Sequence, residues 1–89
     1  EYQKVMMVRT LSGYKVVKET KKKYVLYCIA LETTLKAKKD RVDRDLPNRA
    51  VAGDLLFYDQ FSNKYQKVDS MADLDGKVKD LEKKARRIF

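Results

Sequence analysis

Lysines that stand beside aromatic residues are the side chains of this sequence best suited to a chemical role. Lys21, Lys22 and Lys23 directly precede Tyr24, and a second basic cluster occupies residues 36–41. Cationic side chains attract phosphate groups, and an aromatic ring beside them offers a surface on which a nucleobase can stack. The pattern therefore predicts a surface that binds single-stranded DNA or RNA without sequence specificity.

The charge of the whole chain points in the same direction. The net charge is +8, and 12 of the 21 basic residues but only 6 of the 13 acidic residues lie in residues 1–48. The candidate binding residues are aromatics on or beside predicted strands and the cations near them: Tyr14, Lys15, Lys21, Lys22, Lys23, Tyr24, Lys36, Lys38, Lys39, Arg41, Tyr58, Phe61, Lys64, Tyr65 and Lys67. Nothing in the sequence identifies a reader of the 2′-hydroxyl group, so the choice between DNA and RNA stays open.

The same residues have a second interpretation. Lysines at turns protect the edge of a sheet from pairing with another chain, and tyrosines in a small barrel are usually half-buried in its core. A basic surface also attracts acidic proteins. The alternative function is therefore an adaptor or inhibitor module that binds an acidic protein partner.

The composition argues against an enzyme. The chain has no His, which excludes Ser-His-Asp and Cys-His catalysis and imidazole metal ligands. Cys28, the only cysteine, lies in the most apolar segment, where we expect an unreactive small hydrophobic residue. Asp40, Asp43 and Asp45 could in principle hold Mg²⁺ or transfer protons, but neighbouring arginines neutralise them. We expect a protein without catalytic activity, metal or other cofactor.

No segment of the sequence predicts a membrane protein. The longest apolar segment, residues 24–31, is far shorter than the roughly 20 residues that a membrane-spanning helix needs. A signal-peptide core is not recognisable either. The expected location is the cytoplasm.

Alternating apolar residues predict short strands at residues 2–9, 14–19, 24–31, 50–58 and 65–68, with a bend at Gly53. The segment 24–31 is apolar on both faces, as expected of a central strand. Turns are expected at residues 11–13, where Gly13 can take a positive φ, at 20–23, and at 59–64, where Asn63 suits the left-handed region. The charged interval 32–49, which contains the only proline, predicts a long loop with at most a helical turn.

The last 20 residues, 70–89, predict an amphipathic helix. Ser70 and Asp73 have the spacing of a capping box, and Gly76 weakens the helix by about 1 kcal/mol relative to alanine. Apolar residues follow a heptad pattern: Met71, Leu74, Val78, Leu81, Ala85 and Ile88. This stripe either packs on the sheet of the same chain, which its short length favours, or binds a partner helix, including that of a homodimer.

These elements predict one domain over residues 1–89. Its β-rich core spans residues 1–69, with the basic loop at about 32–49, and its C-terminal helix spans 70–89. The fold class is mainly β or α+β: a small bent antiparallel sheet or partly open barrel, OB or SH3-like, crossed by the C-terminal helix.

Three short motifs carry a family resemblance: Ser12-Gly13-Tyr14 with Val16-Val17, then Gly53-Asp54-Leu55-Leu56-Phe57-Tyr58, then Asn63-Lys64-Tyr65-Gln66-Lys67-Val68. The chain resembles small OB-like single-strand-binding proteins of Gram-positive phages and conjugative elements over about two-thirds of its length. Gln66 stands where that family has a glycine, and the basic interval and C-terminal helix are not part of the resemblance. It implies single-strand binding through the sheet face that carries Tyr14, Tyr58 and Tyr65.

Overall fold

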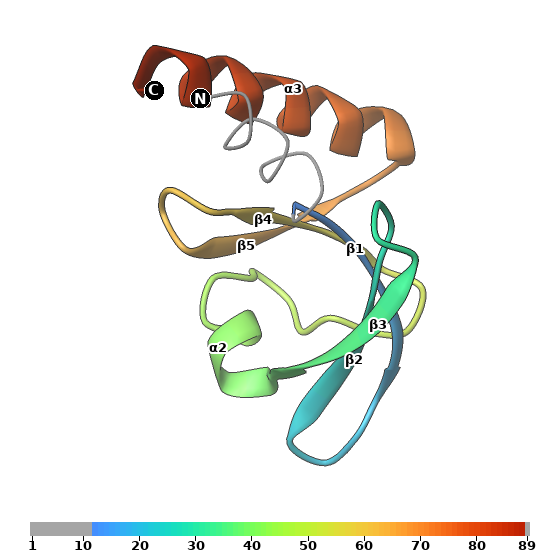
Figure 1. Cartoon of the computed structure of the whole chain (residues 1–89). Helices are drawn as coiled ribbons and strands as arrows, with labels where there is room; N and C mark the ends of the chain where they lie inside the picture. Colours follow the sequence, from blue (N-terminus) through green and yellow to red (C-terminus); the bar gives the residue numbers. More distant parts are fainter. Residues whose placement is uncertain (1–11, 89) are drawn as a thin grey trace.

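The computed structural model describes residues 12–88, in which five strands form one antiparallel sheet and two helices pack against it. The strands are β1 (Gly13–Glu19), β2 (Lys23–Cys28), β3 (Thr33–Lys38), β4 (Leu55–Asp59) and β5 (Lys64–Val68), and the helices are α2 (Lys39–Asp43) and α3 (Met71–Ile88). The sheet order is β3-β2-β1-β4-β5, so the sheet is bent but not closed into a barrel (Figure 1). This confirms the predicted α+β fold of a bent antiparallel sheet with a C-terminal helix.

The bend of the sheet originates in β1. This strand pairs with β2 from Tyr14 to Glu19, with a bulge between Val16 and Lys18, but it pairs with β4 only from Gly13 to Lys15. Beyond that point Val16 exchanges backbone hydrogen bonds of 2.8 and 2.9 Å with Gly53 and Asp54. A bulge increases local twist and bending, so β2 and β3 turn away from β4 and β5.

Two apolar clusters cover the two faces of the sheet. One contains Tyr14, Val16, Tyr24, Leu26, Cys28, Val42, Ala50 and Leu56, on the side of α2 and the connection that follows it. The other joins Phe57 and Val68 of the sheet to Leu74, Val78, Leu81 and Ala85 of α3. In Figure 1, α3 lies across β4 and β5, whereas α2 lies on the opposite side of these strands.

The C-terminal helix begins where the capping pattern predicts. Ser70 Oγ accepts a hydrogen bond of 3.2 Å from the backbone N–H of Asp73, and the N–H of Leu74 donates to the carbonyl of Ser70. The four central residues of the apolar stripe are buried against the sheet, which confirms packing within the chain. Because these side chains are covered, the stripe does not offer them to a partner helix. Met71 is 46% exposed, and the side chain of Ile88 lies outside the described part.

The two predicted hairpin turns are confirmed. Thr20 closes the turn between β1 and β2, with its N–H donating to the carbonyl of Lys23 at 2.8 Å. In the turn between β4 and β5, Asn63 has a φ of 57°, and Asp59 Oδ1 accepts the backbone N–H of Phe61 at 2.9 Å. Gly53 has a φ of 96°, as expected for the bend before β4.

Other sequence expectations are wrong or shifted. The predicted loop at 32–49 contains β3 and α2, because β3 pairs with β2 through its backbone over its whole length. Gly13 begins β1 instead of forming a turn. The central strand ends at Cys28, and β4 starts only at Leu55. The strand predicted at residues 2–9 lies outside the described residues.

Two glycines give a test of how α3 docks on the sheet. A Cβ at Gly13 would stand 3.0 Å from Leu74 Cδ2, whereas a Cβ at Gly76, in the middle of α3, would meet nothing within 4 Å. We expect Gly76→Ala to stabilise the protein by about 0.5–1 kcal/mol and Gly13→Ala to destabilise it by about 1–3 kcal/mol, measured by urea unfolding. Equal effects of the two substitutions would contradict a close contact between β1 and α3.

Candidate nucleic-acid interface

The register of the first three strands places five lysines on one face of the sheet. Directly opposed residues of antiparallel strands share a face, and residues two apart along a strand share it too. Lys15 opposes Tyr27, which opposes Thr34; Lys18 opposes Val25, which opposes Lys36; and Lys23 opposes Lys38. We call these eight residues the lysine face. They lie opposite the buried Tyr24, Leu26 and Cys28 of β2.

None of the three described strands places a carboxylate on the lysine face. Glu19 is the only acidic residue of β1, β2 and β3, and its register partner is the buried Tyr24 of the opposite face. Within residues 12–88, none of the five lysines forms an ion pair, and all five are exposed. At the centre of the face, the side chains of Val25 and Tyr27 are only partly covered. The arrangement combines unpaired positive charge with a partly exposed aromatic side chain.

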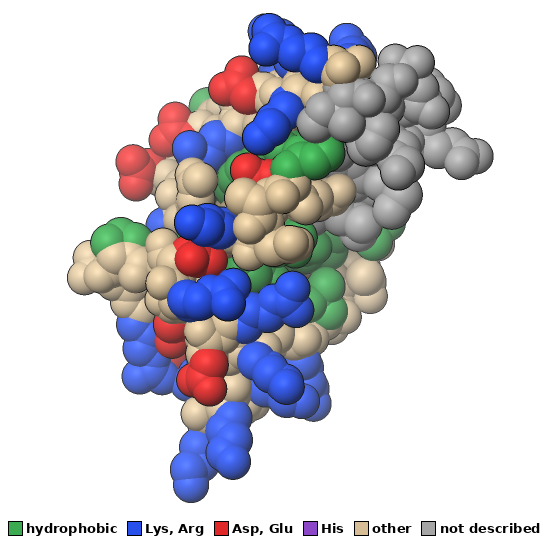
Figure 2. All heavy atoms as spheres, turned by 90° about the vertical axis from the view of Figure 1, so that its left-hand side faces the viewer, with side chains coloured by type: hydrophobic (Ala, Val, Ile, Leu, Met, Phe, Trp, Pro, Cys, Tyr) green, Lys and Arg blue, Asp and Glu red, His purple; other side chains and the backbone are tan. Residues whose placement is uncertain are grey.

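A basic groove adjoins the lysine face at the end of the sheet farthest from α3. Its cations are Lys21, Lys22, Lys23, Lys38, Lys39 and Arg49, its carboxylates are Asp40 and Asp43, and its volume is about 620 Å³. The backbone N–H of Lys39 donates to the carbonyl of Lys22 at 3.0 Å, which ties the two basic clusters of the sequence together. Figure 2 shows Lys and Arg side chains gathered over the lower part of the molecule, where the β1–β2 hairpin lies.

A network of polar contacts fixes the inner wall of this groove. Glu19 pairs with both Lys39 and Arg49, at 3.6 and 3.1 Å. The hydroxyl of Tyr24 donates to Asp43 Oδ1, and the Lys39 ammonium lies 5.5 Å from the centre of the Tyr24 ring. Burial and the hydrogen bond to the Asp43 carboxylate raise the pKa of Tyr24. Lys39 and Arg49 are therefore held in place, whereas Lys21 and Lys22 are exposed at the hairpin tip.

Two of the aromatic residues predicted to stack on bases are buried in the structure. Tyr24 is fully buried and Tyr14 is only 7% exposed, because both belong to the core on the α2 side. Their rings cannot stack on a nucleobase, so the expectation that they form the binding surface is wrong. Their burial agrees with the second interpretation of the sequence, in which tyrosines of the sheet belong to the core.

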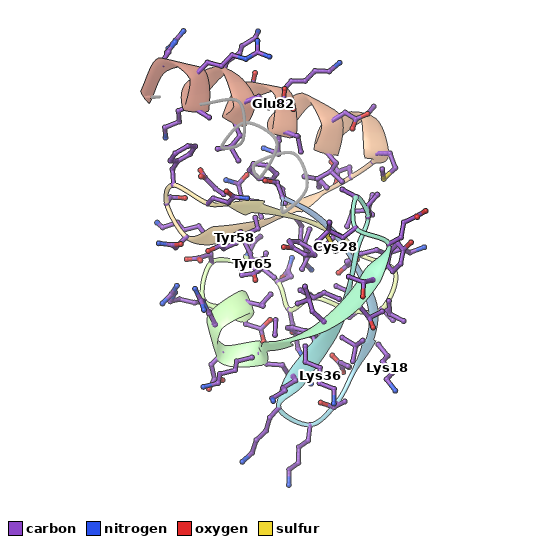
Figure 3. The ribbon with its side chains drawn as sticks, in the orientation of Figure 1. Lys18, Cys28, Lys36, Tyr58, Tyr65 and Glu82 are labelled. Carbon is purple, nitrogen blue, oxygen red and sulfur yellow. The ribbon has the colours of Figure 1, made fainter. Side chains whose placement is uncertain are left out.

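Tyr58 and Tyr65 form a separate, half-buried pair. Their ring centres are 4.8 Å apart at an interplanar angle of 44°, and the Tyr58 hydroxyl donates to Asn63 Oδ1 at 2.7 Å. Figure 3 shows the two side chains together at β4 and β5, far from Lys18 and Lys36. Burial and Tyr58 raise the pKa of Tyr65, while the Arg41 charge lowers it. This pair does not belong to the lysine face.

The remaining predicted cations and Phe61 are also divided among other surfaces. Lys67 Nζ lies 3.5 Å from Asp54 Oδ2 and donates to the carbonyl of Arg49, so its charge is engaged within the chain. Lys64 is exposed at the start of β5. Phe61 packs against the α3 cluster, with the Lys84 ammonium 5.6 Å from its ring centre. The predicted residues therefore do not form one continuous interface.

Sequence reasoning missed Lys18 and Tyr27 as site residues. The sequence places Tyr27 in an apolar segment, which predicts that both of its faces are covered. The bulge that brings Lys18 opposite Val25 has no sequence signature. The alternation of β2 held the missing signal, because the face opposite Tyr24, Leu26 and Cys28 has to carry Lys23, Val25 and Tyr27.

Two findings concern other kinds of site. Among the described residues, no group of His, Cys, Asp and Glu side chains is arranged to hold a metal ion. In the same part of the chain, no helix has the length and apolar character needed to span a membrane.

Comparisons of the chain with protein families, curated proteins and solved structures find no match. The resemblance to OB-like single-strand-binding proteins therefore stays a prediction.

The buried Tyr14 predicts a loss of stability at high pH. Burial, followed by the nearby Cys28, Tyr65 and Tyr58, raises the pKa of Tyr14 from 10.0 to about 12. Above pH 10 the unfolded chain ionises this hydroxyl before the folded protein does, so its contribution to stability is complete below pH 10 and is lost as the pH rises towards 12. We expect the free energy of unfolding of Tyr14→Phe to fall less than that of the wild type when the pH rises from about 9 to about 11, because this range spans the pKa of the unfolded chain.

Lysine deprotonation in the same pH range affects both proteins equally, so the difference between them isolates the Tyr14 hydroxyl. Identical pH profiles from urea unfolding would show that this hydroxyl is not desolvated.

Proposed function

We propose that this protein binds single-stranded nucleic acid without sequence specificity, through the lysine face of β1, β2 and β3. The observation that carries the proposal is that five unpaired lysines share a sheet face with Tyr27, where β1, β2 and β3 place no carboxylate. A phosphate backbone gains affinity by releasing counterions at such a surface. A base that projects from the backbone towards the protein can stack on an exposed aromatic side chain.

The spacing of residues on the lysine face suits an extended single strand of nucleic acid. Rows of residues that share a face repeat about every 6.8 Å along a strand, and neighbouring strands lie about 4.8 Å apart. The three rows of the lysine face therefore offer cations at intervals suited to successive phosphates. The bases of a duplex are already paired and stacked on one another, so only a single strand can stack a base on Tyr27. Among the described residues, no hydrogen-bond network positions a side chain of this face to read a base edge.

The proposed function includes neither catalysis nor a cofactor. Cys28 is buried in the core, Asp43 is bound by Tyr24, and Asp45 lies 3.9 Å from Arg44.

Binding should depend steeply on salt. If five lysines each contact a phosphate, the slope of log K against log salt is about −3.5, and affinity falls roughly 100-fold between 50 and 200 mM salt. Fluorescence anisotropy of a labelled mixed-sequence 20-mer measures this directly, with a duplex of the same sequence as comparison. Undetectable binding at 50 mM salt would refute the proposal and favour an acidic protein partner.

A matched pair of lysine variants locates the surface. Lys36→Gln removes one exposed charge from the lysine face and should reduce the magnitude of the salt slope by about 0.7, whereas Lys83→Gln removes one exposed charge from α3 and should leave binding nearly unchanged. Equal losses in the two variants would mean that net charge, and not this face, determines affinity.

The stacking contribution is tested at Tyr27. Tyr27→Ala should weaken single-strand binding by about 1–3 kcal/mol, and Tyr27→Phe should retain most of it, because stacking uses the ring and not the hydroxyl. Circular dichroism and urea unfolding verify that both variants are folded. Unchanged affinity of a folded Tyr27→Ala protein would exclude a base stacked at this position.

A further inference from the structure

The basic groove has a shape that the lysine face lacks. The lysine face presents its charges on the surface of a sheet, whereas the groove surrounds a volume of about 620 Å³ with six cations. Three carboxylates lie at or beside it, so the positive charge is in excess: Glu19 is shared by Lys39 and Arg49, and Asp43 accepts the Tyr24 hydroxyl. Lys21, Lys22, Lys23 and Lys38 have no such partner among the described residues.

The groove is continuous with the lysine face. Lys23 and Lys38 form the last row of that face and also line the groove. Beyond them the β1–β2 hairpin turns at residues 20–23, and Figure 1 shows this turn at the end of the molecule opposite α3. A nucleic-acid strand that follows the lysine face towards this end of the molecule therefore reaches the groove where the protein surface ends.

We infer that the groove binds the terminal phosphate of the nucleic-acid strand held on the lysine face, an inference that rests on the proposed function. A terminal phosphomonoester carries about −1.5 to −2 charges at pH 7, more than a diester within the chain, and has three free oxygens that accept hydrogen bonds. Only one of its oxygens carries the strand, so it enters a concave site end-on. An internal diester keeps two oxygens in the backbone and fits such a site less well.

The distribution of charge around the groove selects the side on which the phosphate binds. Asp40 and Asp43 repel an anion from the α2 wall. Lys39 and Arg49 are already paired with Glu19, which reduces their remaining charge. The terminal phosphate therefore lies against the hairpin, within reach of Lys21 and Lys22, whose side chains are exposed and unpaired among the described residues.

The test compares matched strands on the intact protein by fluorescence anisotropy at one fixed salt concentration. The strands are a mixed-sequence oligonucleotide with a 5′-phosphate, the same strand with a 3′-phosphate, the unphosphorylated strand, and an unphosphorylated strand one nucleotide longer. The last strand carries one more diester charge, so it controls for added charge without a phosphomonoester. We expect a phosphate at one or both ends to strengthen binding about tenfold, and the extra nucleotide to have a much smaller effect.

Two double variants with the same change in charge assign the gain to the groove. Lys21→Gln with Lys22→Gln should abolish the advantage of the phosphorylated strand while leaving most of the affinity for the unphosphorylated strand. Lys18→Gln with Lys36→Gln should weaken binding of both strands and preserve their ratio. All four lysines are exposed, so we expect these substitutions to leave the fold unchanged.

The outcomes separate this inference from the proposed function. Salt-dependent binding with no advantage of a terminal phosphate over the longer strand overturns the inference and leaves the function standing. So does an advantage that survives in the Lys21→Gln, Lys22→Gln variant. Failure of every strand to bind overturns both.

Discussion

The surfaces of this protein depend on the burial of one face of β2. Tyr24, Leu26 and Cys28 are fully buried in the core on the α2 side, together with Val16 of β1 and Leu56 of β4. Because the side chains of a strand alternate, this burial forces Lys23, Val25 and Tyr27 onto the opposite face. The antiparallel pairing with β1 and β3 then adds four more lysines to the same side. A register shift of one residue in β2 would bring its lysine and Tyr27 into the core, which the loss of apolar burial strongly disfavours.

The same constraint concentrates unfavourable charge interactions at one end of the molecule. Lysines on adjacent strands repel one another, and directly opposed like charges such as Lys23 and Lys38 destabilise a sheet. Glu19 and Asp43 offset this only on the α2 side, where Glu19 pairs with Lys39 and Arg49 and Asp43 accepts the Tyr24 hydroxyl. On the lysine face nothing offsets it among the described residues. The lysine face therefore lowers the stability of the sheet locally and attracts anions.

The exposed edge strand explains the largest error of the sequence-based prediction. No residue of β3 is buried, Ala37 alone is partly covered, and only Leu35 and Ala37 alternate with its lysines, which is too short a pattern to identify the strand in the sequence. It exists because its backbone continues the hydrogen-bonded ladder of β2, an interaction that side-chain patterns do not reveal. The lysines that made the segment look like a loop are also those that discourage further chains from pairing with this edge. By contrast, α3 and the hairpin around Asn63 were predictable, since a capping serine, a heptad stripe and a left-handed residue act locally.

The sequence alone determined the elements whose signals are local: the capped amphipathic helix, the two hairpin turns, the strands around Val16, Leu26 and Phe57, and the excess of positive charge. Tertiary structure decided which tyrosines are accessible and which lysines are neighbours. Tyr24 and Tyr27 are alike in the sequence, three residues apart, yet they lie on opposite faces, and only the position of the core determines which of them is covered. Likewise, Lys23 and Lys38 become neighbours only through strand pairing, because proximity across a sheet is set by register and not by distance along the chain.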